Sequence, residues 1–203
     1  MSFLKYENNI LKFEGVAISE IAKGRTTPFY CYSQNTLIDN FNKFANSVAS
    51  FDSTVCFSLK SNSNLTLLKT LEKLGAGADV VSEWEMRKAL KAGISAKNIV
   101  FSGIGKTDKD IQFAINNDCF QINVESIDEL NRINEIAASI GKVQKIGIRI
   151  NPDIKADTHK KISTGSLEDK FGVSIEDTHK IFQNRANYSS LKISSIAFHI
   201  GSN

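Results

Sequence analysis

Residues 78–102, ADVVSEWEMRKALKAGISAKNIVFS, contain a strand, a helix and a second strand in direct succession. The short apolar run at 78–81 precedes a helical pattern over 83–92, and Gly93 marks the end of that helix. A second apolar run follows at 99–102. Strands that alternate with helices through short links are typical of a parallel α/β sheet.

The same unit recurs on both sides of this stretch. We expect strands at 54–59, 78–81, 99–102, 120–124, 145–150 and 193–200, and helices at 36–48, 65–74, 83–92, 108–116, 126–140 and 175–184. The repeat length fits a (β/α)8 barrel or a doubly wound sheet, and the absence of a Gly-rich fingerprint after the first strand favours the barrel. The sequence therefore predicts a TIM-type barrel truncated after about six strands.

Residues 1–27 lack this alternation of strands and helices. The runs at 8–13 and 16–18 predict a small antiparallel piece, so we expect residues 1–27 to contribute to a β domain and residues 28–203 to form the barrel. A further short strand is predicted at 29–32.

Composition excludes several classes of protein. Hydrophobic residues at 41% and charged residues at 23% are typical of a globular chain, and a net charge of +3 is too small to indicate nucleic-acid binding. No apolar run predicts a membrane span or a signal peptide. Cys31, Cys56 and Cys119 lie in apolar runs without metal-ligand spacing, so we expect buried thiols in a cytoplasmic protein.

Polar side chains are predicted to meet at one rim of the barrel. In the first strand Val55, Phe57 and Leu59 form the face that packs against helices, which leaves Lys60 pointing into the barrel mouth. Catalytic sites of such barrels form at the carboxyl ends of the strands. The same alternation brings three more polar residues to this rim, Asn123, Arg149 and His199. Asp79 joins them because it ends the second strand.

This convergence indicates a chemical site. A single inward lysine is usually a residue whose stem is buried and whose ammonium reaches water. Five polar groups at one rim are harder to explain as core, because buried charges are costly unless they are paired or used. A lysine desolvated among cationic neighbours is a good nucleophile toward an aldehyde, which is the chemistry that pyridoxal phosphate requires of a protein.

Several motifs resemble those of one enzyme family. VCFSLKSNSN at 55–64 is similar to the YAxKAN lysine motif of the fold-type III, alanine-racemase-like decarboxylases, and GADVVSEWE at 77–85 resembles their GxDVVSxGE segment. SGIGKT at 102–107, NVES at 123–126, RINPD at 149–153 and HIGS at 199–202 follow in the expected order. HxxIxTG at 159–165 with KFG at 170–172 resembles the diaminopimelate decarboxylases more than the ornithine or arginine decarboxylases.

The resemblance implies roles for individual residues. Lys60 is expected to form a Schiff base with pyridoxal 5'-phosphate, and His199 to stack on the cofactor ring as the second catalytic residue. Asp79 and Arg149 match positions near the ring and the lysine. Two more residues match positions that contact the cofactor phosphate, Gly201 and Ser202, and Glu85 matches a carboxylate at the start of the second helix.

The implied activity is decarboxylation of meso-diaminopimelate to L-lysine, with an amino acid as small-molecule substrate and a homodimer as the assembly. An ornithine, arginine or polyamine-precursor decarboxylase stays open as an alternative. So does an inactive, truncated fragment that binds pyridoxal phosphate.

Two other functions are disfavoured. A P-loop reading of SGIGKT would need glycine at position 100, which is Val100, so we expect Lys106 and Thr107 to cap the next helix instead. His159, His179 and His199 are scattered without short ligand spacing, and the sequence predicts no metal site. His179 is expected at the surface.

Overall fold

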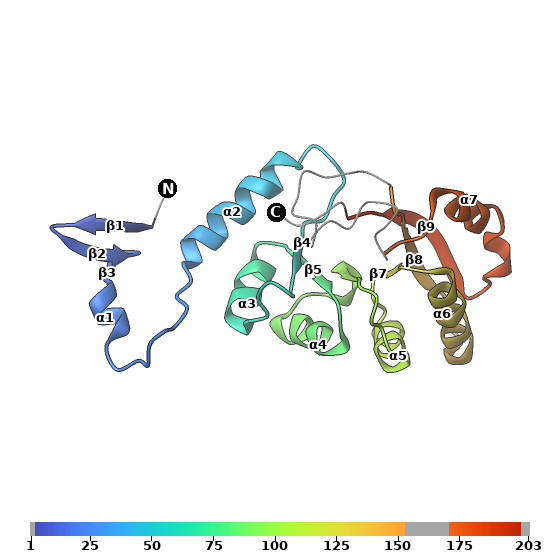
Figure 1. Ribbon diagram of the computed structural model, residues 1–203, viewed down its shortest axis with the longest axis horizontal. Coiled ribbons are helices and arrows are strands. Elements are labelled where there is room, and N and C mark those ends of the chain that lie inside the picture. Colours follow the sequence, from blue (N-terminus) through green and yellow to red (C-terminus); the bar gives the residue numbers. More distant parts are fainter. Residues whose placement is uncertain (1–2, 153–170, 200–203) are drawn as a thin grey trace.

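The computed structural model describes residues 3–152 and 171–199 of the chain. It contains a small antiparallel sheet near the N-terminus and a six-stranded parallel sheet, with helix α2 (Gln34–Ser47) between them in the chain (Figure 1). In the described residues no helix is long and apolar enough to cross a membrane.

The parallel sheet follows the order of the chain. Each strand pairs in parallel with the next, in the order β4 (Cys56–Ser58), β5 (Gly77–Val80), β6 (Ile99–Phe101), β7 (Gln121–Val124), β8 (Gln144–Arg149) and β9 (Leu191–Ala197). A doubly wound sheet would reverse its strand order at a switch point, and this sheet has no reversal. The architecture is therefore that of a barrel wall, as the sequence predicts.

The helices connect successive strands and lie in chain order along the sheet (Figure 1). They are α3 (Leu65–Lys73), α4 (Glu83–Ala92), α5 (Asp108–Asn116), α6 (Ile127–Ile140) and α7 (Ile175–Gln183), with short 3-10 turns at Ala96–Asn98 and Arg185–Asn187. Helices α4 and α6 end at Gly93 and Gly141, whose φ angles of 103° and 73° are left-handed. Glycine adopts this conformation at little cost, which explains why the helices stop there.

Two helix starts share one local motif. Ser82 caps α4 and Ser126 caps α6, and each hydroxyl accepts the N–H of the glutamate three residues later. That glutamate, Glu85 or Glu129, accepts in turn the N–H of the residue before the serine, at 2.9 and 2.8 Å. The repeated Ser-x-x-Glu pattern therefore fixes the strand-to-helix turns after β5 and β7.

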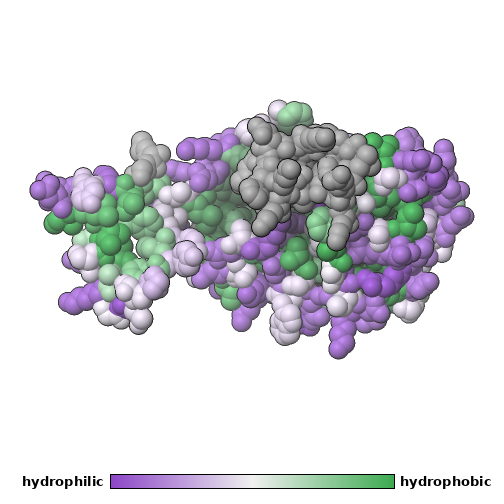
Figure 2. All heavy atoms as spheres, viewed as in Figure 1, coloured by the Kyte–Doolittle hydropathy of each residue, from purple (hydrophilic) through white to green (hydrophobic). Residues whose placement is uncertain are grey.

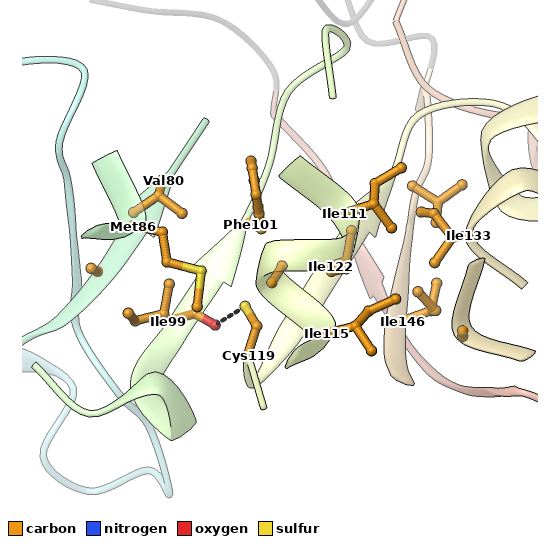
Figure 3. Packing of buried hydrophobic residues seen from close by; sticks show 14 of the residues in the cluster. Val80, Met86, Ile99, Phe101, Ile111, Ile115, Cys119, Ile122, Ile133 and Ile146 are labelled. Atoms are coloured by element: carbon orange, nitrogen blue, oxygen red, sulfur yellow. Dashed lines mark hydrogen bonds between the residues drawn. The ribbon is translucent and has the colours of Figure 1, made fainter. Parts of the chain in front are cut away.

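The core fills the space between the sheet and its helices (Figure 3). Its side chains come from the outward faces of the strands and the inward faces of α4, α5 and α6. Those that are at most 1% exposed include Met86, Ile99, Phe101, Ile111, Ile115, Ile122, Ile133 and Ile146. Burying one such side chain stabilises a fold by roughly 1.5–3 kcal/mol, so this layer holds the strand ends that carry the site.

The N-terminal sheet has antiparallel strands β1 (Leu4–Glu7), β2 (Ile10–Phe13) and β3 (Val16–Ala17), followed by α1 (Ile18–Ala22). A β-type segment was expected here, although β1 was missed. The described residues of this sheet include exposed Leu4, Tyr6 and Ile10, and Figure 2 shows hydrophobic surface gathered over this part of the molecule. The domain division at residue 27 stays a prediction.

The strand predicted at 29–32 is wrong. These residues have no regular secondary structure, and Tyr30 is 89% exposed. No strand in the described ranges pairs with them, so their apolar pattern lacks the partner that a strand needs. Tyr30 and Tyr32 stack on each other instead, with ring centroids 6.2 Å apart, and Cys31 between them is exposed rather than buried.

Several large apolar side chains beside the parallel sheet are exposed. Trp84 is 73% exposed, with the Arg87 guanidinium 5.6 Å from its ring centroid. Ile196 and Phe198 are also exposed, and no helix in the described ranges follows β9 to cover them. The last strand ends at Ala197, three residues earlier than predicted.

Candidate active site

Lys60 follows the first strand of the parallel sheet. The backbone N–H of Leu59 donates to the Asp79 carbonyl oxygen at 3.0 Å, which continues the pairing of β4 with β5 beyond Ser58. Leu59 is 1% exposed and packs in the core, whereas Lys60 on the opposite side is exposed. The alternation predicted from the sequence is therefore correct, but the expected desolvation of the lysine is wrong because Lys60 lies at the open rim.

All five predicted rim residues line one pocket of about 300 Å³. The pocket lies at the carboxyl ends of the strands, which is the end where barrel enzymes place their active sites. Its charged and polar lining comprises Lys60, Asp79, Ser102, Asn123, Glu125, Arg149 and His199. The pocket thus collects one amine, one guanidinium, one imidazole and two carboxylates from strands that are far apart in the sequence.

A hydrogen-bond chain fixes the inner wall of this pocket. The Asp79 carboxylate accepts from Ser58 Oγ at 2.9 Å and from Ser102 Oγ at 2.6 Å. Asn123 Nδ2 donates to Ser102 Oγ at 3.1 Å, and Gln121 Nε2 donates to Asn123 Oδ1 at 2.8 Å. Both oxygens of Asp79 therefore have protein donors, and its carboxylate is held at a fixed place beside the pocket.

Arg149 reaches the pocket from the end of β8 and forms an ion pair with Glu125. Arg149 Nη1 lies 3.0 Å from Glu125 Oε1 and 2.8 Å from Oε2. The two side chains are only 14% and 5% exposed. The ring of Phe171 lies 5.5 Å from the guanidinium carbon, so an aromatic face also contacts the cation.

His199 is two residues beyond the end of β9 and still lines the pocket. Partial burial and the nearby cations Arg149 and Lys60 hold the pKa of His199 below its ordinary value, although the carboxylates of Asp79 and Glu125 oppose the shift. This shift favours the uncharged form of the imidazole. An uncharged ring can pack against a flat ligand without adding charge to the pocket.

Glu125 was missed by the sequence analysis. It continues the inward alternation of Gln121 and Asn123 one step beyond β7, and this signal could have identified it. Lys106 was misassigned. Thr107 caps α5 as expected, through a reciprocal bond with Asp110, but Lys106 forms a buried ion pair with Glu129 instead.

The remaining predicted residues lie away from the pocket or outside the described ranges. Glu85 accepts a backbone N–H at the start of α4 and does not line the pocket. Gly201, Ser202 and the motif at 159–165 lie outside the described residues. His179 is exposed, as expected, and the described ranges contain no cluster of His, Cys, Asp and Glu that could hold a metal ion.

The two least exposed cysteines carry weakly acidic thiols. Burial raises the pKa of Cys119 to about 12. Burial and the nearby Asp79 carboxylate raise the pKa of Cys56 to about 11. Neither thiol is a good nucleophile at neutral pH, since the thiolate is the reactive form.

The sequence matches a family of pyridoxal enzymes. Residues 34–203 match the family described as pyridoxal-dependent decarboxylase, pyridoxal binding domain. The chain is 40% identical over 200 residues to a diaminopimelate decarboxylase of Aquifex aeolicus, covering 98% of this chain and 47% of that protein. A diaminopimelate decarboxylase of Haemophilus influenzae is 38% identical over 202 residues, covering 100% and 49%. The chain thus spans about half the length of the curated relatives it matches.

Solved structures agree with this result. Diaminopimelate decarboxylase from Helicobacter pylori complexed with L-lysine superimposes with a TM-score of 0.88 at 42% identity, over 91% of this chain and 47% of that one. The M. jannaschii enzyme in complex with L-lysine gives 0.89 at 32% identity, over 98% and 48%. The resemblance inferred from the motifs is confirmed.

Proposed function

The chain belongs to the pyridoxal-dependent decarboxylases, whose pyridoxal binding domain it matches, and on this premise we propose that it is part of an enzyme that decarboxylates meso-diaminopimelate to L-lysine and carbon dioxide. The observation that carries the proposal is the pocket that joins Lys60, Asp79, Arg149 and His199. The identity of 40% to a diaminopimelate decarboxylase over nearly the whole chain supports the choice of substrate.

The groups in the pocket fit pyridoxal 5'-phosphate. Lys60 offers a primary amine that can bond to the cofactor's aldehyde, and its exposure leaves the amine accessible. The imidazole of His199, whose pKa is lowered by burial and by nearby cations, suits the face of an aromatic ring, and the Arg149 guanidinium suits an anionic group. When bound, the cofactor supplies an electron sink for the pair left by departing carbon dioxide.

The chain's own residues would position the reacting groups. Lys60 Nζ would hold the cofactor, and the same amine would be placed to carry a proton in the pocket. The hydrogen bonds from Ser58 and Ser102 hold the Asp79 carboxylate at a fixed place in the pocket that also contains Lys60 and Arg149. His199 would bind the ring without adding charge. Gly201 and Ser202 remain our candidates for contacts to the cofactor phosphate.

We also propose that the protein is a cytoplasmic homodimer. All three cysteines are free, which is typical of a reducing compartment. The dimer rests on the family resemblance alone. Size-exclusion chromatography with light scattering of the full-length gene product would test it, and a monomer at micromolar concentration would contradict it.

The activity is tested by measuring carbon dioxide release from meso-diaminopimelate, ornithine and arginine by the full-length gene product with added pyridoxal phosphate. We expect turnover of meso-diaminopimelate and its loss in Lys60→Ala. Preferential turnover of ornithine or arginine would replace the substrate assignment. Unchanged turnover in Lys60→Ala would contradict the role of the lysine.

A further inference from the structure

One buried glutamate of the pocket lining, Glu125, lies beside a second buried glutamate and a buried lysine that do not line the pocket. Lys106, Glu125 and Glu129 are 3%, 6% and 8% exposed. Buried charges of this kind cost several kcal/mol of desolvation unless partners compensate them, so their arrangement requires an explanation. Lys106 and Glu129 do not line the pocket, and the proposed decarboxylation assigns a role to none of the three.

The three residues form a closed ring of hydrogen bonds with one loop. Lys106 Nζ donates to Glu129 Oε1 at 2.9 Å and to the carbonyl oxygen of Gly103. Glu129 Oε2 accepts the backbone N–H of Glu125 at 2.8 Å. Glu125 Oε1 then accepts the backbone N–H of Gly103 at 3.1 Å. The loop after β6 and the end of β7 are thereby joined to helix α6.

This ring fixes the Glu125 carboxylate at the place where Arg149 meets it. Its two oxygens flank Arg149 Nη1, while its backbone and Oε1 are held by Glu129 and Gly103. A guanidinium on a long side chain has many rotamers, and ordering it costs conformational entropy that a preformed partner can offset. Burial of both partners makes this ion pair less screened than a surface pair.

We propose that Glu125 is a positioning residue for cofactor binding, which holds the Arg149 guanidinium against the pocket and is itself held by Gly103, Lys106 and Glu129. The inference rests on the proposed function, because it assumes that the pocket takes pyridoxal phosphate. It assigns a role to the SGIGKT segment, whose lysine holds Glu129 and the Gly103 carbonyl oxygen and supports Glu125 through them. Glu125 acts through Arg149 and needs no contact with the cofactor.

A double-mutant cycle tests the proposal. The dissociation constant for pyridoxal phosphate is measured by absorbance titration for the full-length gene product, for Glu125→Gln, for Arg149→Met and for the double variant. The matched control is Glu83→Gln, which breaks a Glu–Arg pair on the outer surface of α4, 2.7 Å between Glu83 Oε1 and Arg87 Nη2. Thermal melting of each variant reports on the fold separately.

We expect each single variant to weaken binding roughly tenfold or more, as for the loss of a charge-assisted hydrogen bond. The double variant should bind no more weakly than Arg149→Met, because Glu125 acts through that residue. Glu83→Gln should leave binding unchanged. Multiplicative losses in the double variant, or unchanged binding in Glu125→Gln, would overturn the proposal.

The design separates this inference from the proposed function. If the unchanged protein shows no saturable binding, both fail. If it binds the cofactor but the affinity losses of the two single variants multiply in the double variant, only the role of Glu125 fails. Should Glu125→Gln not fold, Glu125→Asp replaces it in the same cycle, since it keeps the charge and draws the carboxylate back from Arg149. The same dependence on Arg149 is then expected, and multiplicative losses again overturn the proposal.

Discussion

Replacing Glu129 by glutamine should destabilise the fold by about 3–5 kcal/mol, because it leaves the Lys106 ammonium buried without its carboxylate. The Lys106 side chain is 0% exposed and that of Glu129 is 8% exposed, with 2.9 Å between Nζ and Oε1. Glutamine keeps an oxygen that can accept the N–H of Glu125. The variant therefore isolates the loss of charge from the loss of the helix-start hydrogen bond.

The magnitude can be bracketed with two further variants. Glu129→Ala also leaves the Glu125 N–H without its acceptor and should cost about 1–3 kcal/mol more than the glutamine variant. The double variant Lys106→Met with Glu129→Gln removes the buried charge altogether. It should regain most of the loss, to within about 1 kcal/mol of the unchanged chain, because apolar replacements of buried ion pairs are often neutral.

The buried Lys106 makes the stability of the fold depend on pH in a definite direction. Burial lowers the pKa of Lys106 below its ordinary value of 10.5, and the Glu129 carboxylate opposes the shift. Between the folded and the unfolded pKa the unfolded chain binds more protons, so stability rises with pH there. Removing the carboxylate lowers the folded pKa further. The stability that Glu129→Gln loses relative to the unchanged chain should therefore become smaller as the pH rises toward 10.5, the ordinary pKa of lysine.

Urea unfolding followed by far-ultraviolet circular dichroism measures these differences. Glu176→Gln is the matched control, because Glu176 and Lys180 form an exposed pair 2.9 Å apart on α7 and its loss should have no measurable effect. The reasoning is refuted if Glu129→Gln is as stable as this control. It also fails if the double variant is no more stable than Glu129→Gln.

Three further outcomes are expected. Phe101→Ala, in the centre of the core, should lose about 3–5 kcal/mol in urea unfolding, and a smaller loss would mean that the site refills. Gly77→Ala should lose about 1–3 kcal/mol, because its Cβ would meet a backbone carbonyl oxygen, whereas Gly105→Ala has open space and should melt like the unchanged chain. Arg149→Met should raise the pKa of His199 in an NMR titration, since it removes a cation that lowers this pKa, and a lower pKa would contradict the electrostatic account.

Local signals explain what could be predicted from the sequence. The helix predicted at 108–116 has the observed bounds, because Thr107 caps it through its own side chain. Gly93 and Gly141 end two other helices for an equally local reason. The positions of Lys60, Asp79 and the other rim residues on their strands were then enough to predict that they share one pocket.

Features that depend on distant partners were missed. The apolar run at 29–32 reads as a strand, but strand formation needs a neighbour that no local pattern reveals. The ion pair of Lys106 with Glu129 joins residues 23 positions apart, and nothing in either segment specifies the other.

The central claim is that Lys60 is the residue that binds pyridoxal phosphate. The most direct measurement is to mix the protein with the cofactor, reduce with borohydride and locate the modified lysine by peptide mass mapping. The account predicts a label concentrated on Lys60, reduced when Asp79 or His199 is replaced by alanine. A label spread over surface lysines, with Lys60 no more modified than the rest, would contradict it.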